Sequence, residues 1–332
     1  MDNLTHTMTG VVLSRAGLYR VAPRATLTLV LAANAPDIDT LTWWGGSLDY
    51  LRYHRGYTHA LAGLPLVAAL VSIVVWLLGR RSGDKFRWGR TYLVALLGVV
   101  SHSLMDFTNV YGIRPWLPFA PSWYSWDISF IVDVWLWVVL AVCLAGPALG
   151  RLISGEIGAR PGKGTAAAIV ALLFIAGWWG LRDLNHGRAL AMLEAHVYGS
   201  NLAASSDSDS ARNPQGVEPL RVGAFPNAFN PFVWRGVVEA EIFYQVLDVH
   251  VGRPLDPTSG RILYKPEKTP ALAAAERTQT AFQFTAFARY RHATVDRRED
   301  GYRVVFVDLR FPWRSTIDLD RELRVVREDF SF

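Results

Sequence analysis

Histidines and aspartates gather in four short clusters within the first 106 residues of this chain. In the last cluster, His102 and Asp106 stand four residues apart in an apolar run, so a helix would present both on one face. Such a pair can hold one metal ion together. Imidazole and carboxylate ligands without a thiolate suit zinc, manganese or iron. The clusters are Thr5-His6-Thr7, Pro36-Asp37-Ile38-Asp39, His54-Arg55-Gly56-Tyr57-Thr58-His59 and Ser101-His102-Ser103-Leu104-Met105-Asp106.

Each cluster also has a plainer interpretation when taken alone. Asp37 and Asp39 could be turn formers, and His102 with Asp106 could be a structural hydrogen-bonded pair. The joint occurrence favours a metal site, because four of the eight histidines lie in the first 102 residues, each in a cluster or beside an aspartate. The predicted metal ligands are His6, Asp37, Asp39, His59, His102 and Asp106.

Two further residues of the third cluster could take part in catalysis. His54 is the candidate proton shuttle, because imidazole titrates in the useful range. Arg55 could clamp a phosphate oxygen, or it could anchor the chain near lipid headgroups. Asp127 and Asp133 could support the site from behind its ligands, although Asp127 could also cap a helix.

Four apolar runs are long enough, or nearly so, to cross a bilayer, which takes about 20 residues. They cover residues 60–79, 92–107, 128–149 and 165–181. Residues 25–35 are apolar but short and predict a half-helix, and residues 9–21 predict an amphipathic helix. The short loops between the first two runs and between the last two are basic, which places them in the cytoplasm. The candidate metal site and the C-terminal part should then face outward.

The chain changes character after the last apolar run. Residues 1–199 predict a helical membrane domain, 200–232 a linker with a turn-rich stretch at 201–215, and 233–332 a small extracytoplasmic α+β domain. Strand patterns cover 237–251, 281–295 and 302–311, a short strand could lie at 323–327, and 271–280 looks helical. The predicted fold is thus mainly α, a polytopic helical membrane domain with a C-terminal extramembrane α+β domain.

Composition excludes several classes of function. Hydrophobic residues make up 51% of the 332 residues and charged residues only 19%. The single cysteine, Cys143, excludes an internal disulfide and a cysteine-based zinc site. The net charge of +5 comes largely from loop residues that set topology, and the C-terminal part lacks a basic stripe. We therefore expect the lipid bilayer as a partner and no nucleic acid.

The four clusters resemble, in order and spacing, the signatures of the YdjM-type family. The likeness begins at Met1-Asp2-Asn3-Leu4-Thr5-His6 and is strong over residues 1–150. Asn230-Pro231-Phe232-Val233-Trp234 and Asp308-Leu309-Arg310-Phe311 look like the tail of its longer members. The resemblance implies a multi-pass inner-membrane, metal-dependent hydrolase. His102 and Asp106 also match a His-x-x-x-Asp pair of zinc-dependent phospholipase C and related single-strand nucleases, which implies zinc.

These observations favour a membrane-bound hydrolase that uses metal-activated water on a phosphoester. A lipid phosphoester is the favoured substrate, because lipids are the nearest plentiful substrate for a site at the bilayer surface. One alternative is a metal transporter or sensor, which would place ligands in the middle of the membrane. The others are a non-catalytic scaffold with a structural metal and a nuclease.

Overall fold

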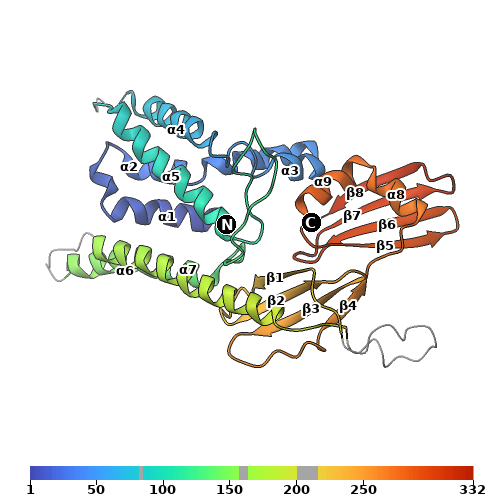
Figure 1. Ribbon diagram of the computed structural model, residues 1–332. Coiled ribbons are helices and arrows are strands. Elements are labelled where there is room, and N and C mark those ends of the chain that lie inside the picture. The colour runs from blue at the N-terminus through green and yellow to red at the C-terminus, as the bar shows by residue number, and fades with distance from the viewer. Residues whose placement is uncertain (82–84, 157–163, 200–215, 332) are drawn as a thin grey trace. The chain divides into compact units, whose positions relative to one another are not determined.

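The computed structural model describes residues 1–81, 85–156, 164–199 and 216–331 (Figure 1). For residues 151–156 it describes the backbone and not the side chains. The chain divides into two compact units. The first comprises Met1–Thr42 and Tyr53–Asp183, and the second comprises Trp43–Arg52 and Leu184–Phe332. Residues 201–215, where a linker is predicted, lie outside the described residues.

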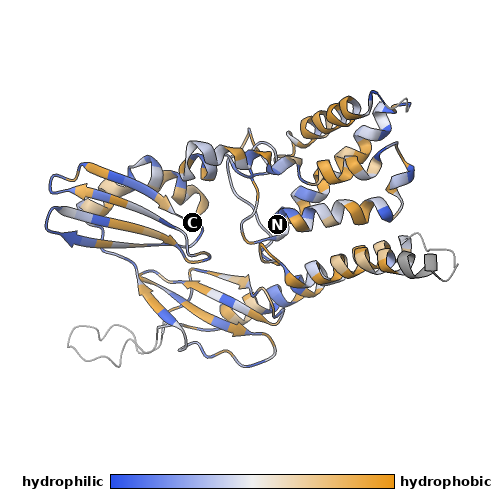
Figure 2. Cartoon of the chain, turned by 180° about the vertical axis from the view of Figure 1, so that it is seen from behind, coloured by the Kyte–Doolittle hydropathy of each residue, from blue (hydrophilic) through white to orange (hydrophobic). Residues whose placement is uncertain are grey.

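The first unit is helical. Helices α4 and α2 pack against α5, and α1 packs against α2 and α6. In Figure 2 the helix α4 is mainly hydrophobic, whereas α1, which begins at the N label, mixes hydrophilic and hydrophobic residues. The elements before the C-terminal unit are α1 (Asn3–Arg15), η1 (Leu18–Arg20), α2 (Ala25–Ala32), η2 (Ala35–Gly45), α3 (Ser47–Tyr53), α4 (Leu64–Gly79), α5 (Trp88–Thr108), α6 (Val134–Glu156) and α7 (Thr165–Glu194).

Helix α5 is the central helix of the site. Its buried residues recur every three or four positions, from Thr91 through Val94 and Gly98 to His102 and Asp106, as expected for a helix with one face against a core. Gly98 permits a close approach to α2, because a Cβ at this position would lie 2.6 Å from the Cβ of Ala32. The face that carries His102 and Asp106 is therefore pressed against the end of α2.

The N-terminal helix is fixed at its first turn. The Asp2 carboxylate caps α1 by accepting a hydrogen bond from the Thr5 amide at 3.0 Å. The Trp137 indole of α6 donates to the same carboxylate and to the Thr5 hydroxyl. These contacts fix the first turn of α1, which carries His6.

Two of the described helices, α5 and α7, are long and apolar enough to cross a membrane. Helix α4 and residues 134–150 of α6 are apolar but shorter. The predicted spans at 92–107 and 165–181 thus coincide with α5 and α7. The runs at 60–79 and 128–149 form helices in large part, and their crossing of a membrane stays a prediction.

The second unit contains two antiparallel four-stranded sheets, ordered β1-β2-β3-β4 and β5-β6-β7-β8. Leu193 of α7 packs with Trp234 and Phe243 in the core of the first sheet. The elements are β1 (Arg221–Pro226), β2 (Val233–Glu239), β3 (Phe243–His250), β4 (Arg261–Tyr264), α8 (Pro270–Glu276), α9 (Gln279–Phe287), β5 (Arg291–Arg298), β6 (Gly301–Asp308), β7 (Arg314–Asp320) and β8 (Val325–Ser331).

The prediction of a strand at 281–295 was wrong in its first half. Residues Gln279–Phe287 form helix α9, because the Thr278 hydroxyl caps it by accepting from the Ala281 amide. Ala281, Phe284 and Phe287 are then buried on one face at helical spacing. The structure also forms strand β1, Arg221–Pro226, within the stretch interpreted as a linker.

Candidate metal centre

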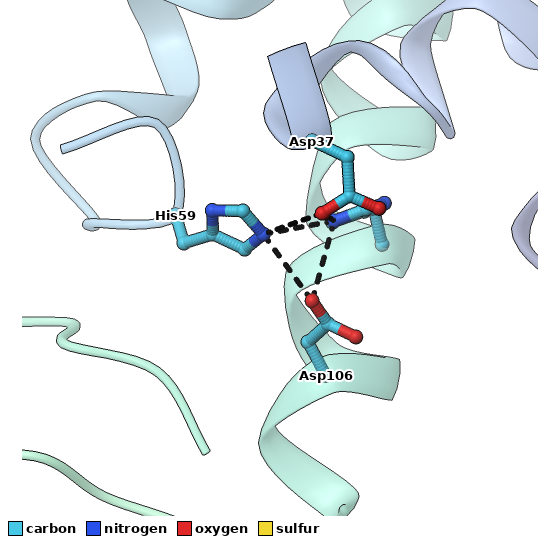
Figure 3. Close-up of side chains that lie close together, drawn as sticks. Asp37, His59 and Asp106 are labelled. Carbon is cyan, nitrogen blue, oxygen red and sulfur yellow. Dashed lines mark hydrogen bonds and ion pairs between the residues drawn. The ribbon is translucent and has the colours of Figure 1, made fainter. Parts of the chain in front are cut away.

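Four ligand atoms from three separate segments converge in the first unit. They belong to Asp37 of η2, His59 in the loop before α4, and His102 and Asp106 of α5, and all lie within 4.8 Å of one another. Figure 3 shows the Asp37 and Asp106 carboxylates and the His59 imidazole directed toward one another. The His59 Nε2 atom lies 3.5 Å from Asp37 Oδ1 and 3.2 Å from Asp106 Oδ2. The four residues are buried.

The hydrogen bonds of the His59 and His102 rings decide whether their Nε2 atoms donate or accept. His102 Nδ1 lies 2.7 Å from the Ala33 carbonyl oxygen, which can only accept, so the proton belongs on Nδ1 and Nε2 is an acceptor. His59 Nδ1 lies 3.0 Å from the Thr58 hydroxyl, which gives its own proton to Asp39 Oδ2, so the hydroxyl oxygen accepts from His59 Nδ1 and the His59 Nε2 atom is also an acceptor. Yet the two Nε2 atoms lie only 2.9 Å apart. Two lone pairs that face each other at this distance call for a cation.

The two carboxylates at the centre also have oxygens without a hydrogen-bond donor. Asp37 Oδ1 and Asp106 Oδ2 are buried and accept no hydrogen bond from any residue that the structure describes. A buried acceptor without a donor is costly. The four convergent atoms are therefore two imidazole nitrogens and two carboxylate oxygens, all lone-pair donors. This set fits a divalent cation, and mixtures of imidazole and carboxylate suit zinc, manganese or iron.

The other oxygen of Asp106 contacts basic groups. Asp106 Oδ1 accepts from Arg55 Nη2 at 3.0 Å and forms an ion pair with the Met1 amino group. His6 Nε2 lies 3.3 Å from the same oxygen, and the His6 ring stacks on His102 with centroids 3.8 Å apart. These contacts hold one oxygen and leave Oδ2 directed at the centre.

Asp39 organises the residues around the centre rather than pointing into the same group. Its Oδ1 lies 2.7 Å from His54 Nδ1. Its Oδ2 accepts from the Arg55 amide at 2.9 Å and from the Thr58 hydroxyl at 2.6 Å, besides facing His59. A carboxylate behind a ligating imidazole fixes the ring and raises its basicity. Asp37, Asp39 and His54 also form a second group of the right proximity for a metal ion, which shares Asp37 with the first.

Protonation states at the centre suit metal binding. Burial would raise the pKa of Asp37, and the His102 and His59 imidazoles beside it hold that pKa well below its usual range when they carry a proton toward the carboxylate. Burial would likewise raise the pKa of Asp39, and its contacts with His54 and His59 lower it. Burial and the nearby His102 ring lower the pKa of His6, and burial lowers the pKa of His54. The Asp37 and Asp39 carboxylates are thus ionised, as metal ligands must be, and the neighbouring His6 and His54 imidazoles add no positive charge at pH 7.

The family model described as "YdjM inner membrane protein" matches residues 1–186, more than half of the chain, and this stretch contains every residue of the centre. The chain belongs to this family. It is also similar to the "Uncharacterized protein YfhP" of Bacillus subtilis (strain 168), with 24% identity over 328 residues that cover 94% of this chain and 87% of that protein. No solved structure matches the chain. The likeness to YfhP extends through the C-terminal unit, beyond the part that defines YdjM proteins.

The site residues predicted from the sequence fall into two groups. This YdjM protein brings together His6, Asp37, Asp39, His54, Arg55, His59, His102 and Asp106. Asp127 and Asp133 have other partners. Asp127 accepts from the Ser125 hydroxyl, and Asp133 caps α6 and accepts from the Trp178 indole.

Several groups at the centre lay beyond the sequence argument. Asn109 Oδ1 accepts from Arg55 Nη1 at 3.1 Å and from the Tyr111 amide at 2.9 Å, which holds the guanidinium against Asp106. Its position three residues after Asp106 is a signal that could have identified it. The Ala33 carbonyl and the Met1 amino group are backbone atoms, which residue types do not reveal.

Arg55 is held in an uncommon backbone conformation. Its φ of +53° lies in the left-handed region, which non-glycine residues seldom adopt. The Arg55 amide bonds to Asp39 and its guanidinium to Asp106 and Asn109. Such strain persists only where the surroundings impose it, and it is concentrated at functional sites.

Proposed function

We propose that this YdjM protein is a membrane-bound hydrolase that uses a divalent metal, with zinc as the first candidate, to cleave a phosphoester, in particular one in a lipid. The observation that carries the proposal is the convergence of His59 Nε2, His102 Nε2, Asp37 Oδ1 and Asp106 Oδ2 without donors among the described residues. A divalent ion held there would activate water for attack and polarise a phosphoryl oxygen.

The residues around the four ligands have distinct roles in this proposal. Arg55 lies against Asp106, where its guanidinium would neutralise charge that develops on a phosphoryl group. His54 is the candidate to take up and release a proton, because its imidazole is kept neutral by burial and oriented by Asp39. Asp39 would position His54 and His59, and His6 would complete the set of imidazoles.

The proposal includes a multi-pass arrangement with the centre and the C-terminal unit at the outer face of the inner membrane. The basic loops around residues 80–90 and 151–163 support it. His102 and Asp106 lie in the last two turns of α5, so the ligands would sit near one membrane surface. Reporter fusions after residues 85, 120 and 200 test this arrangement. Cytoplasmic signal from the first and periplasmic signal from the other two are expected, and the reverse would overturn it.

A structural metal in a non-catalytic scaffold is the second candidate. The complete burial of His59, His102 and Asp106 favours it, because structural sites are closed whereas catalytic sites keep an open position. Against it, His59 also lines a surface groove of about 450 Å³, so one ligand lies beside a space that a substrate could enter. A transporter is less favoured because the ligands lie near a helix end and not halfway along it.

The first experiment measures bound metal by elemental analysis of detergent-purified protein. The wild type is compared with His102→Ala/Asp106→Ala and with the control His250→Ala/Asp256→Ala, which changes the same residue types in the second unit. We expect about one or two metal ions per wild-type and control chain and loss in the first variant. A folded wild type that takes up no added zinc, manganese or iron would refute the hydrolase. Bound metal without hydrolysis of any phospholipid or aryl phosphate would favour the scaffold.

A further inference from the structure

An apolar groove of about 450 Å³ opens beside the candidate metal centre in the first unit. This volume lies within the range of small-molecule pockets, about 300–1,000 Å³. The loop before α4, the second half of α5 and the loop after α5 form its walls. The residues that matter for its chemistry are His59, Val100, Ser103, Leu104, Ile113 and Trp116.

The groove continues a lipid-facing stripe of α5. Leu93, Leu97, Val100 and Leu104 are exposed large hydrophobic residues at successive helical turns. Helix α5 is a candidate membrane span, and exposed leucines on such a helix face hydrocarbon. Val100 and Leu104 belong to the stripe and also line the groove together with His59, so the stripe and the groove share two apolar side chains.

Two of the residues along the groove, His59 and Ser103, connect it to the centre or carry a polar group. His59 carries both the groove wall and, on Nε2, one of the four convergent atoms. Ser103 follows His102 directly, is 5% exposed, and its hydroxyl has no hydrogen-bond partner among the described residues. A buried hydroxyl without a hydrogen-bond partner, in a residue that lines an apolar groove, suits the oxygen that links a phosphate to a hydrocarbon chain.

The loop that covers the groove is tied to the centre. The Leu61 amide donates to the Pro115 carbonyl at 2.9 Å, and Ile113 pairs with Tyr124 by two backbone hydrogen bonds of 2.9 Å. The Arg114 amide donates to the Arg55 carbonyl at 3.2 Å. These backbone hydrogen bonds therefore hold Trp116 at the groove and also join its loop to Arg55, the candidate residue for binding a phosphate oxygen.

We propose that this groove binds a hydrocarbon chain of the substrate, so that the substrate is an amphiphilic phosphoester with its phosphate at the metal centre and its chain along α5. The inference rests on the proposed function. A peptide is a poorer occupant, because its backbone N–H and C=O groups need polar partners that an apolar groove does not offer. A linear alkyl chain has no such groups.

The test is calorimetric titration of zinc-loaded protein with inorganic phosphate, butyl phosphate and octyl phosphate in a sterol-based detergent, which has no linear chain to occupy the groove. Each methylene that enters an apolar environment strengthens binding by about two- to fourfold. Octyl phosphate should therefore bind at least roughly 16-fold more tightly than butyl phosphate, and butyl phosphate at least as tightly as inorganic phosphate.

Leu104→Trp fills the groove and should reduce the affinity for octyl phosphate to that for butyl phosphate while leaving butyl phosphate unchanged. Leu97→Trp places the same ring on the same stripe outside the groove and should change neither. Trp116→Ala, which removes a wall instead of filling the space, should also weaken octyl phosphate selectively. Metal content is measured for every variant to verify that the centre is intact.

The outcomes separate the two proposals. Metal-dependent binding of phosphate and butyl phosphate without any gain from the longer chain would overturn the groove and leave the hydrolase standing. Tight octyl phosphate binding that persists after zinc is removed would retain the groove and count against phosphate binding at the metal. An equal effect of Leu97→Trp and Leu104→Trp would overturn the groove, because the chain would then bind the whole stripe.

Discussion

Replacing Asp39 by asparagine tests how far the centre depends on a residue behind its ligands. The carboxylate contacts four groups: His54 Nδ1 at 2.7 Å, the Arg55 amide at 2.9 Å, the Thr58 hydroxyl at 2.6 Å and His59 Nδ1 at 3.3 Å. Asparagine keeps one acceptor oxygen but turns the other into an amide that cannot accept. The His59 ring then loses its charged partner, and the oxygen that remains cannot serve both His54 and the other three donors.

Loss of such a partner typically weakens metal binding by 10- to 100-fold, which corresponds to about 1.4–2.7 kcal/mol. Asp39→Asn should therefore still bind zinc, with an affinity reduced by one to two orders of magnitude. Asp106→Asn should lose more, because a charged ligand is removed outright. The assay is a zinc titration against a chromophoric chelator of known affinity, carried out on detergent-purified protein.

Asp127→Asn is the matched control, because Asp127 is also buried but contacts Ser125 instead of the centre. It should bind zinc as the wild type does. Two results would refute the reasoning. Wild-type affinity in Asp39→Asn would mean that Asp39 does not orient His59, and an equal loss in Asp127→Asn would mean that any buried charge change disturbs the fold.

Three further predictions concern packing, metal removal and pH. Gly98→Ala should lower stability by about 1–3 kcal/mol and weaken zinc binding, because the new methyl group meets Ala32. The control Gly89→Ala on the same helix meets nothing within 4 Å and should be neutral or stabilising. Thermal unfolding and the zinc titration check both variants. A strong chelator should lower the melting temperature of the wild type but not of Asp106→Asn, since zinc at 100 times its Kd adds about 2.7 kcal/mol; equal shifts would contradict a metal bound at this site. Burial raises the pKa of Tyr198 to about 12, above the value of about 10 for an unfolded phenol. The contribution of Tyr198 to stability is therefore complete below about pH 10 and is lost as the pH rises toward 12. In Tyr198→Phe the free energy of unfolding should fall less steeply with pH over that interval, as followed by tryptophan fluorescence.

The ligand types could be predicted because their spacing carries the geometry. His102 and Asp106 lie one helical turn apart, and the sequence predicts a helix there, so their common face follows directly. The approach of Asp37 and His59 depends on how the segments pack. In the sequence, only the occurrence of Asp37 and His59 in neighbouring clusters indicated that they approach each other. The tautomers depend on the Ala33 carbonyl and on Asp39, and a backbone carbonyl has no signature in residue types.

The C-terminal unit shows where strand patterns mislead. The stretch around Phe284 is aromatic, which favours strands on composition, but its apolar residues recur at helical spacing behind the Thr278 cap. The helical spacing of the apolar residues and the Thr278 cap therefore make this stretch a helix instead of a strand. Residues Gly301–Asp308, by contrast, alternate in large part between buried and partly exposed positions, and the predicted strand at 302–311 agrees with β6 as far as Asp308. Strand β1 was missed because it is only six residues long and ends at Pro226.

The separation of the ligands along the chain has a consequence for chain entropy. Cys143 is the single cysteine, so no covalent bridge can join distant parts of this protein. An ion bound by His59 and His102 would link residues 43 positions apart, and Asp37 would extend the closed segment further toward the N-terminus. Such a link removes conformations from the unfolded ensemble much as a disulfide does, with a larger effect for a longer loop. In this protein the metal would serve as the cross-link that its sequence cannot form from sulfur.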